Sequence, residues 1–215
     1  MLDLLLPRRC VRCLAPGSGL CTNCATSLPA APDLAAPPGI ERCWSLLEHR
    51  DAGRDVVVAL KYHRHHDAVA LLGAAMAELV DRRVDLVTWA PTSPRRRRAR
   101  GFDQAEVLAR SVAGSLSVPC RELLVRSTGA TQTGHGRAER LSGPQFRCRA
   151  GRAPRVPVLL VDDVRTTGAT LCAAAEALAG SGVPTVLGVT LSARRWSGGQ
   201  LGGSWAQGCS PESMR

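Results

Sequence analysis

The sequence has no long hydrophobic run and few aromatic residues. No apolar stretch approaches the roughly 20 residues that a membrane-spanning helix needs. The apolar run at the N-terminus is too short for a secretory signal and is interrupted by Asp3, so we expect a cytosolic (cytoplasmic) protein. Aromatic residues make up 3% of the chain against 45% hydrophobic residues in total, so Leu, Val and Ala must fill the core.

The sequence has almost no lysine, and it lacks the P-loop motif that binds phosphate in many NTPases. The chain has no G-x-x-x-x-G-K-[ST] loop, which sets aside a P-loop NTPase. Lys61 is the only lysine among 28 Lys and Arg residues, so arginine carries the net charge of +10. Because arginine binds phosphate bidentately, the charge permits a small polyanion or nucleic acid as ligand. A solvated basic face without a dedicated partner is an equal alternative.

The most informative segment is VLLVDDVRTTGAT at residues 158–170. Its four aliphatic residues predict a strand buried on both faces, as in a parallel sheet, which Asp162 and Asp163 are expected to end. The small-residue loop then leads to a helix start near Thr170, where backbone N–H groups can bind a phosphate. Ribose hydroxyls fit between that phosphate and the two carboxylates, so the segment predicts a ribose-5-phosphate site. The alternative is an ordinary strand–helix turn, in which Asp and Thr are common capping residues.

This segment resembles the phosphoribosyl-diphosphate (PRPP) motif of type I phosphoribosyltransferases, a hydrophobic strand followed by two acids and T-T-G-x-T. The resemblance implies that Asp162 and Asp163 are catalytic and contact the ribose hydroxyls. It also implies a run of PRPP-binding residues around the 5-phosphate, namely Arg165, Thr166, Thr167, Gly168, Ala169 and Thr170.

Near the N-terminus, two C-x-x-C pairs are separated by seven residues, and they comprise Cys10, Cys13, Cys21 and Cys24. Each pair can place two thiolates on one metal ion, which predicts a closed structural Zn²⁺ site. Metal binding would then supply the folding energy of a segment without a core of its own. Two disulfides are disfavoured by the expected reducing compartment, while a redox pair or iron–sulfur ligation stays open. The remaining cysteines are scattered and are expected to be small core or surface residues.

The chain divides by composition into a zinc knuckle at 1–26, a Pro/Ala-rich linker at 27–39, a main domain at 40–195 and a Gly/Ser-rich tail at 196–215 that is expected to be disordered. Within the main domain we expect strands at 43–48, 85–91, 122–125, 157–162 and 185–191. Helices are expected at 56–61, 69–80, 102–115 and 169–180, with a loop at 91–94 and a mobile polar stretch at 127–155. This alternation predicts an α/β fold with a doubly wound parallel sheet that binds ligands at the carboxyl ends of its strands.

A further motif, Arg100-Gly101-Phe102-Asp103-Gln104, follows an arginine run that by itself indicates a solvated or nucleic-acid-binding face. Together with the cysteine knuckle and the PRPP-like segment, it resembles the ComF/GntX-like proteins, in which a cysteine knuckle precedes a phosphoribosyltransferase-like domain. Other elements follow in the family's order, namely Leu60-Lys61-Tyr62, Ala90-Pro91-Thr92, Gln132, Arg140 and Phe146. The chain departs from the family pattern at Ala90-Pro91-Thr92-Ser93, where P-V-P-L is usual, and at Gly143, where Asn is usual.

The resemblance implies a fold of the type I phosphoribosyltransferase kind and a glycosyltransferase activity. Such an enzyme passes the phosphoribosyl group of PRPP to a nitrogenous acceptor through an oxocarbenium-like transition state, and pyrophosphate leaves with Mg²⁺. The residues implied for pyrophosphate are Pro91, Thr92, Ser93 and Arg100, with Arg140 closing over it. Lys61 is either a phosphate contact or an incidental surface residue.

The same resemblance implies a link to natural competence, the uptake of single-stranded DNA. An alternative function is therefore a non-catalytic protein that binds single-stranded DNA, a helicase or another competence protein. A third is regulatory binding of PRPP or a nucleotide without turnover.

Overall fold

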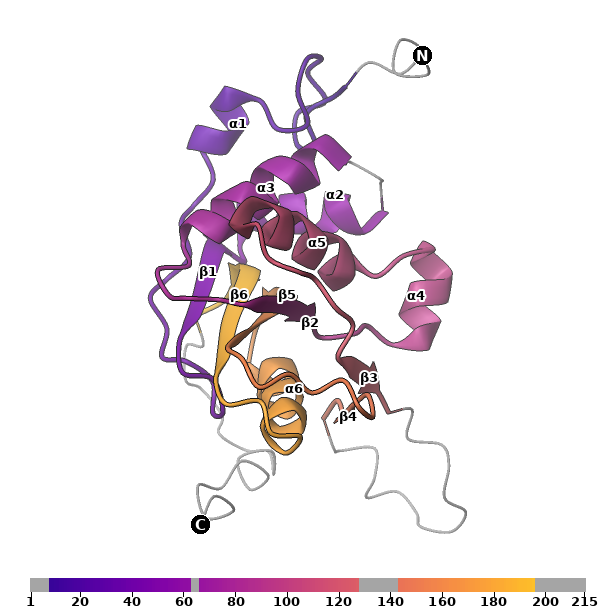
Figure 1. Cartoon of the computed structure of the whole chain (residues 1–215). Coiled ribbons are helices and arrows are strands. Elements are labelled where there is room, and N and C mark those ends of the chain that lie inside the picture. Colours follow the sequence, from indigo (N-terminus) through magenta and orange to yellow (C-terminus); the bar gives the residue numbers. More distant parts are fainter. Residues whose placement is uncertain (1–7, 63–65, 128–142, 196–215) are drawn as a thin grey trace.

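The structure is a computed structural model that describes residues 8–62, 66–127 and 143–195 (Figure 1). Its helices are α1 (Thr22–Thr26), α2 (Asp51–Tyr62), α3 (His66–Glu78), α4 (Pro94–Arg100), α5 (Gln104–Leu116) and α6 (Ala169–Ala179). Its strands are β1 (Cys43–Glu48), β2 (Leu86–Trp89), β3 (Leu124–Arg126), β4 (Phe146–Cys148), β5 (Val158–Arg165) and β6 (Val186–Ala193).

Four parallel strands form the central sheet in the order β1-β6-β5-β2. Helices α2, α3 and α5 cover one face, while α6 and the antiparallel pair β3–β4 cover the other (Figure 1). Side chains of β5 alternate between the two faces, since Leu159 and Val161 join one core and Val158 and Leu160 join the other. The expected α/β fold with a doubly wound parallel sheet is confirmed.

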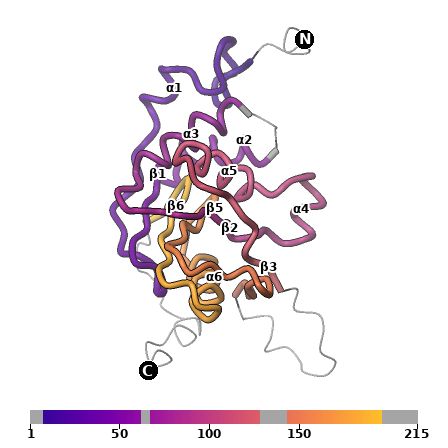
Figure 2. Tube along the Cα trace, in the orientation of Figure 1, coloured from indigo at the N-terminus to yellow at the C-terminus, as the bar shows by residue number. Residues whose placement is uncertain are grey.

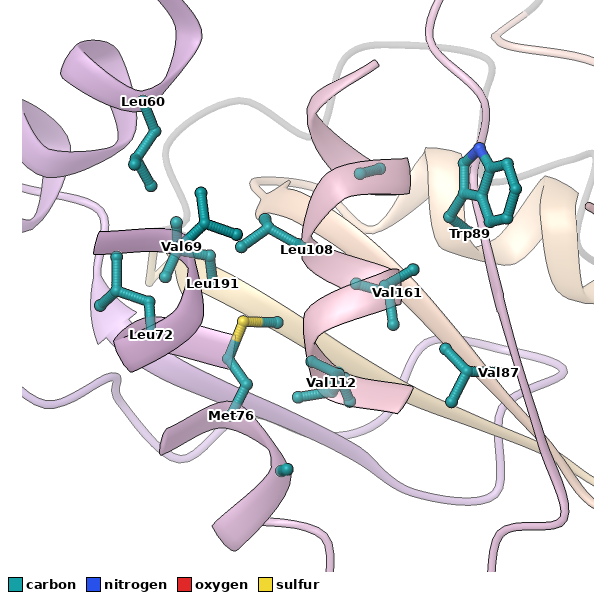
Figure 3. Packing of buried hydrophobic residues seen from close by; sticks show 14 of the residues in the cluster. Leu60, Val69, Leu72, Met76, Val87, Trp89, Leu108, Val112, Val161 and Leu191 are labelled. Atoms are coloured by element: carbon teal, nitrogen blue, oxygen red, sulfur yellow. The ribbon is translucent and has the colours of Figure 1, made fainter. Parts of the chain in front are cut away.

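Aliphatic side chains fill both cores, as expected from the scarcity of aromatic residues, and the indole of Trp89 adds one buried ring. The larger core lies between the sheet and the helices α2, α3 and α5. Figure 3 shows side chains of α3 and α5 meeting those of the strands, among them Leu72, Met76, Leu108, Val112, Val161 and Leu191. This packing fixes α5, and with it the start of that helix, against β2 and β5.

Strand β5 is longer than expected. It runs to Arg165, so Asp162 and Asp163 lie within the strand, and the expectation that they end it is wrong. The reason is the neighbouring strand β6, which continues to Ala193. Parallel pairing between the two strands therefore extends through Asp162↔Thr190 and Val164↔Ser192. Backbone pairing with a parallel neighbour therefore outweighs the polarity of the two side chains.

The arginine run is also structured, because residues 94–100 form helix α4 instead of a loop that includes Pro94. The Ser93 hydroxyl accepts a hydrogen bond from the Arg96 N–H at 3.3 Å, and Pro94 occupies the first turn. Gly101 ends the helix at φ 79°, a left-handed conformation that favours glycine. Strand β4 lies inside the stretch expected to be mobile, where it pairs with β3.

The segment after α1 runs along the edge of the sheet toward α6, as the chain trace in Figure 2 shows. The Ala31 N–H donates to the Leu46 carbonyl at 3.1 Å, and the Glu48 N–H donates to the Pro29 carbonyl at 2.9 Å. The proposed boundaries of knuckle, linker and main domain stay predictions, and the tail at 196–215 lies outside the described residues. Within the parts of the chain that are described, no helix has both the length and the apolar character needed to cross a membrane.

Candidate functional site

A cavity of about 230 Å³ lies where β2 and β5 end. The chain leaves β2 toward the face covered by α5, and it leaves β5 toward the face covered by α6. Such a change of direction between adjacent parallel strands is where doubly wound folds bind ligands. The lining residues are Lys61, Ala90, Pro91, Thr92, Arg96, Arg100, Asp103, Gln104, Ala105, Arg126, Asp162, Asp163, Val164, Thr166 and Thr170.

Two adjacent carboxyl groups lie on one wall in different environments. Asp162 is 8% exposed, and its burial, followed by the nearby charge of Asp163, raises its pKa well above the usual value. Its Oδ1 accepts a hydrogen bond from the Asp163 N–H at 2.8 Å. Asp163 instead forms an ion pair with Lys61, with Nζ and Oδ2 3.0 Å apart. The wall therefore presents one carboxylate neutralised by lysine and one carboxyl group that holds its proton more readily than usual.

The loop between β5 and α6 contributes Thr166 and Thr170 to the cavity. Gly168 adopts φ +82°, and a Cβ there would lie 3.3 Å from Cγ of Pro37, so glycine suits this turn on both counts. The Thr167 hydroxyl accepts a hydrogen bond from the Ala169 N–H at 3.3 Å. Arg165 is not part of the cavity lining, and its side chain donates to the carbonyl of Ala35.

The opposite wall is organised by Asp103, which is 2% exposed and caps helix α5. Its Oδ2 accepts from the Thr92 N–H at 2.8 Å, and its Oδ1 accepts from the Ala105 N–H at 3.1 Å. Burial raises the pKa of Asp103, although the hydrogen bonds from Thr92 and Ala105 oppose that rise. The carboxylate thus ties the loop after β2 to the first turn of α5.

Three arginines, Arg96, Arg100 and Arg126, line the same cavity as the carboxyl groups and add positive charge to it. The guanidinium of Arg126 lies 5.6 Å from the centroid of the Phe146 ring. Burial of Arg126, and next the charge of Arg96, lower its pKa, which marks it as a partly desolvated cation. Cations of this kind favour an anionic ligand.

The structure brings together about half of the site residues expected from the sequence. Those that line the cavity are Asp162, Asp163, Thr166, Thr170, Pro91, Thr92 and Arg100. Those described but absent from its lining are Ser93, Arg165, Thr167, Gly168 and Ala169. Arg140 and Gln132 lie outside the described residues.

Seven residues of the lining received no ligand role from the sequence, although several of them lie in motifs that carry the family resemblance. The seven are Ala90, Arg96, Asp103, Gln104, Ala105, Arg126 and Val164. An Asp directly before an apolar helical run is a signal for a helix cap, and it would have placed Asp103 at the start of α5. No local signal marks Arg126, which arrives from β3 on the other face of the sheet. Lys61 lines the cavity and forms an ion pair with Asp163. The sequence had left open whether Lys61 is a phosphate contact or an incidental surface residue.

The four N-terminal cysteines form a second site. All their sulfur atoms lie within 4.8 Å of one another, and the Cys13 and Cys21 sulfurs are 3.6 Å apart. A tetrahedron with metal–sulfur distances of about 2.3 Å places its sulfurs about 3.8 Å apart, so the cluster fits one metal ion. Burial acts to raise the pKa of the Cys10 thiol, but N–H donors of Cys13, Cys21 and Arg12 bring it down to about 6. The expected knuckle can therefore hold a metal.

Disulfides do not form among these cysteines, since Cys10, Cys13, Cys21 and Cys24 are all free thiols in the structure. Four thiolates gathered around one point repel one another unless a cation lies between them. Because four sulfurs complete a tetrahedron, such a site keeps no open position for catalysis.

Comparison with known proteins finds relatives along most of the sequence. The chain is 29% identical over 195 residues to the DNA utilization protein YhgH of Salmonella typhi, covering 82% of this chain and 85% of that protein. It is 27% identical, with the same coverage, to DNA utilization protein YhgH of Escherichia coli (strain K12). No protein-family model matches the chain.

Solved structures with a similar backbone path include phosphoribosyltransferases and related enzymes. The allosteric regulatory enzyme of purine biosynthesis is 22% identical with a TM-score of 0.44, covering 59% of this chain. The present chain spans only 26% of the length of that enzyme. Adenine phosphoribosyltransferase from Leishmania tarentolae is 14% identical with a TM-score of 0.38, covering 64% of this chain and 74% of that one. The fold assignment rests on the strand order and layers described above.

Proposed function

We propose that the cavity between β2 and β5 binds PRPP or a related ribose 5-phosphate, and that the chain is a ComF/GntX-like protein of the phosphoribosyltransferase type. The observation that carries the proposal is the convergence of the acidic pair, the loop hydroxyls and the three arginines on one cavity. Of these, Arg96 and Arg126 were not among the residues that suggested the ligand.

The chemistry of the lining suits a sugar that carries phosphate at both ends. Thr166 and Thr170 lie beside the start of α6, where the 5-phosphate would bind. Ribose hydroxyls would donate to Asp162 and Asp163, and Arg96, Arg100 and Arg126 would contact the diphosphate. A raised pKa at Asp162 reduces the repulsion between this wall and a polyanion.

Transfer of the phosphoribosyl group to a nitrogenous acceptor is the reaction that this arrangement would support. Arginines at the diphosphate would offset the charge that develops on it as the bond to C1 breaks. Mg²⁺ would enter as the counterion of the diphosphate, and we assign no residue to it. We further propose that the four-cysteine cluster holds structural Zn²⁺ and that the cluster stabilises the N-terminal segment.

The experiment is a calorimetric titration of the zinc-loaded protein with PRPP and Mg²⁺. Asp163→Asn removes the carboxylate from the cavity, and Asp55→Asn is the matched control because Asp55 is exposed on α2. Loss of a hydrogen bond to a charged group weakens binding by about tenfold or more. We expect binding by the wild type and by Asp55→Asn, and at least tenfold weaker binding by Asp163→Asn. A folded wild type that releases no heat and takes up no ligand would refute the proposal.

A second candidate function, binding of single-stranded DNA, is favoured by the exposed arginines on α4. Arg95, Arg97 and Arg98 are all exposed beside the cavity, and the YhgH relatives are named for DNA utilization. Affinity that rests on phosphate contacts falls steeply as salt rises. Titration of a fluorescent single strand at several salt concentrations, with Arg97→Gln/Arg98→Gln beside the wild type, tests this function. A salt slope that the double substitution does not reduce would exclude α4 as the DNA-binding element.

A further inference from the structure

One buried side chain of the cavity carries an amide without hydrogen bonds to the described residues. Gln104 is the first residue of α5 and is 2% exposed. Within the described part of the chain, neither Nε2 nor Oε1 of its amide has a hydrogen-bond partner. Buried amides in folded proteins almost always have partners, so an amide without one calls for an explanation.

Capping of the helix does not supply the explanation. The neighbouring Asp103 already accepts the N–H groups of Thr92 and Ala105, which leaves Gln104 outside that network. An amide buried without hydrogen bonds destabilises the folded state, whereas an apolar side chain of similar shape at the same position would not. Because none of the described residues satisfies this amide and it lines the cavity, we expect a ligand bound there to supply its partners.

The cavity that Gln104 lines also contains flexible groups that a ligand can displace. Arg96 and Arg100 lie in the same lining, and long arginine side chains reorient at little cost in packing. A ligand that binds these arginines would therefore lie in the same cavity as the Gln104 amide. The amide then offers donors at Nε2 and an acceptor at Oε1.

A ligand that satisfies both atoms must accept and donate at neighbouring positions. A phosphorylated sugar does so, since its phosphate oxygens accept and its hydroxyls donate. Inorganic pyrophosphate near neutral pH is mainly an acceptor, and it would leave Oε1 without a donor. The chemistry of this one side chain therefore separates sugar phosphates from inorganic phosphates.

We propose that Gln104 is a specificity-determining residue that donates to a phosphate oxygen and accepts from a sugar hydroxyl of the bound ligand. This inference rests on the proposed function of the cavity. It adds a discriminating contact on the wall opposite the acidic pair, at a position that the PRPP-like segment does not include.

The test compares Gln104→Leu with Gln145→Leu, a matched control because Gln145 is exposed. For the ligand-free, zinc-loaded protein we expect Gln104→Leu to raise the melting temperature, because it removes a buried amide without partners. We expect at least tenfold weaker binding of PRPP by Gln104→Leu and a clearly smaller loss for pyrophosphate, because pyrophosphate loses only the donor at Nε2 whereas PRPP loses the acceptor at Oε1 as well. Gln145→Leu should leave both affinities unchanged.

The outcomes separate this inference from the proposed function. Binding of PRPP by the wild type together with unchanged affinity in Gln104→Leu would overturn the role of Gln104 alone. A lowered melting temperature in Gln104→Leu would also overturn it, because the amide would then be a structural group. A wild type that binds neither compound, or only pyrophosphate, would overturn both.

Discussion

The ion pair between Lys61 and Asp163 can be tested most quantitatively. Nζ and Oδ2 are 3.0 Å apart, and each side chain is 20% exposed. At this separation the attraction is about 5.5 kcal/mol for an effective dielectric constant near 20 and about 1.4 kcal/mol for that of water. Removal of both groups from water opposes this gain, so we expect a net coupling of about 2 kcal/mol.

A double-mutant cycle measures this coupling directly. Lys61→Met leaves Asp163 without its cation and next to Asp162, and we expect the free energy of unfolding to fall by about 2–3 kcal/mol. Asp163→Asn leaves Lys61 unpaired but also relieves the repulsion between the two carboxyl groups, so its loss should be smaller. The double substitution should destabilise the protein by about 2 kcal/mol less than the sum of the two single changes.

Urea unfolding of the four zinc-loaded proteins at one pH gives the required free energies, provided that the slopes with urea agree. Additive effects within about 0.5 kcal/mol would refute the reasoning, because they would show that water screens the pair. Repeating the cycle in high salt is the control, since a partly buried pair is screened less than an exposed one.

Three further predictions concern the acidic pair, the cysteines and the loop before α6. Because the folded-state pKa of Asp162 is raised above its usual value of 3.8, the stability present below that value is lost as pH rises through the folded pKa. Asp162→Asn should therefore gain stability over the wild type as pH rises, in thermal unfolding measured across pH, and a gain independent of pH would contradict this. Removal of the metal by a strong chelator, or Cys24→Ser, should expose residues 8–26 to protease, with one metal ion per chain lost in elemental analysis. Gly168→Ala should cost about 1–3 kcal/mol, because φ is +82° and Pro37 lies 3.3 Å from the new Cβ. Its control, Gly114→Ala in the exposed surface of α5, meets no atom within 4 Å and should stabilise the protein by up to about 1 kcal/mol.

Structural features that depend on residues close together in the chain could be predicted from the sequence. The strand at 157–162 could be predicted because four aliphatic residues in a row are typical of a strand buried between two layers. Likewise, the spacing of Cys10, Cys13, Cys21 and Cys24 was enough to predict that their sulfurs meet. Both predictions depend on residues within about 15 positions of one another, over which chain geometry limits the alternatives.

Features that depend on a distant partner could not be predicted in the same way. Strand β5 continues past Asp162 where β6 pairs with it as far as Ala193. Strand β4 exists because β3 pairs with it across the segment that lies outside the described residues. Gln104 belongs to the same class, because an amide without partners is recognisable only when its full surroundings are known.

The Pro/Ala-rich segment at 27–39 makes tertiary contacts that its composition does not predict. A Pro/Ala-rich composition without periodic apolar residues predicts a flexible linker. Such a segment can still contact the domain through its backbone carbonyls and proline rings, and these contacts leave no periodic pattern in the sequence. Ala35 accepts a hydrogen bond from Arg165, and Pro37 packs against Gly168. The segment thereby contacts both Arg165, which is not part of the cavity lining, and the loop before α6. The PRPP-like motif places Arg165 on the ligand, and that contact stays a prediction. In the structure the Arg165 side chain instead donates to the carbonyl of Ala35, a contact between segments 130 positions apart that the motif alone does not reveal.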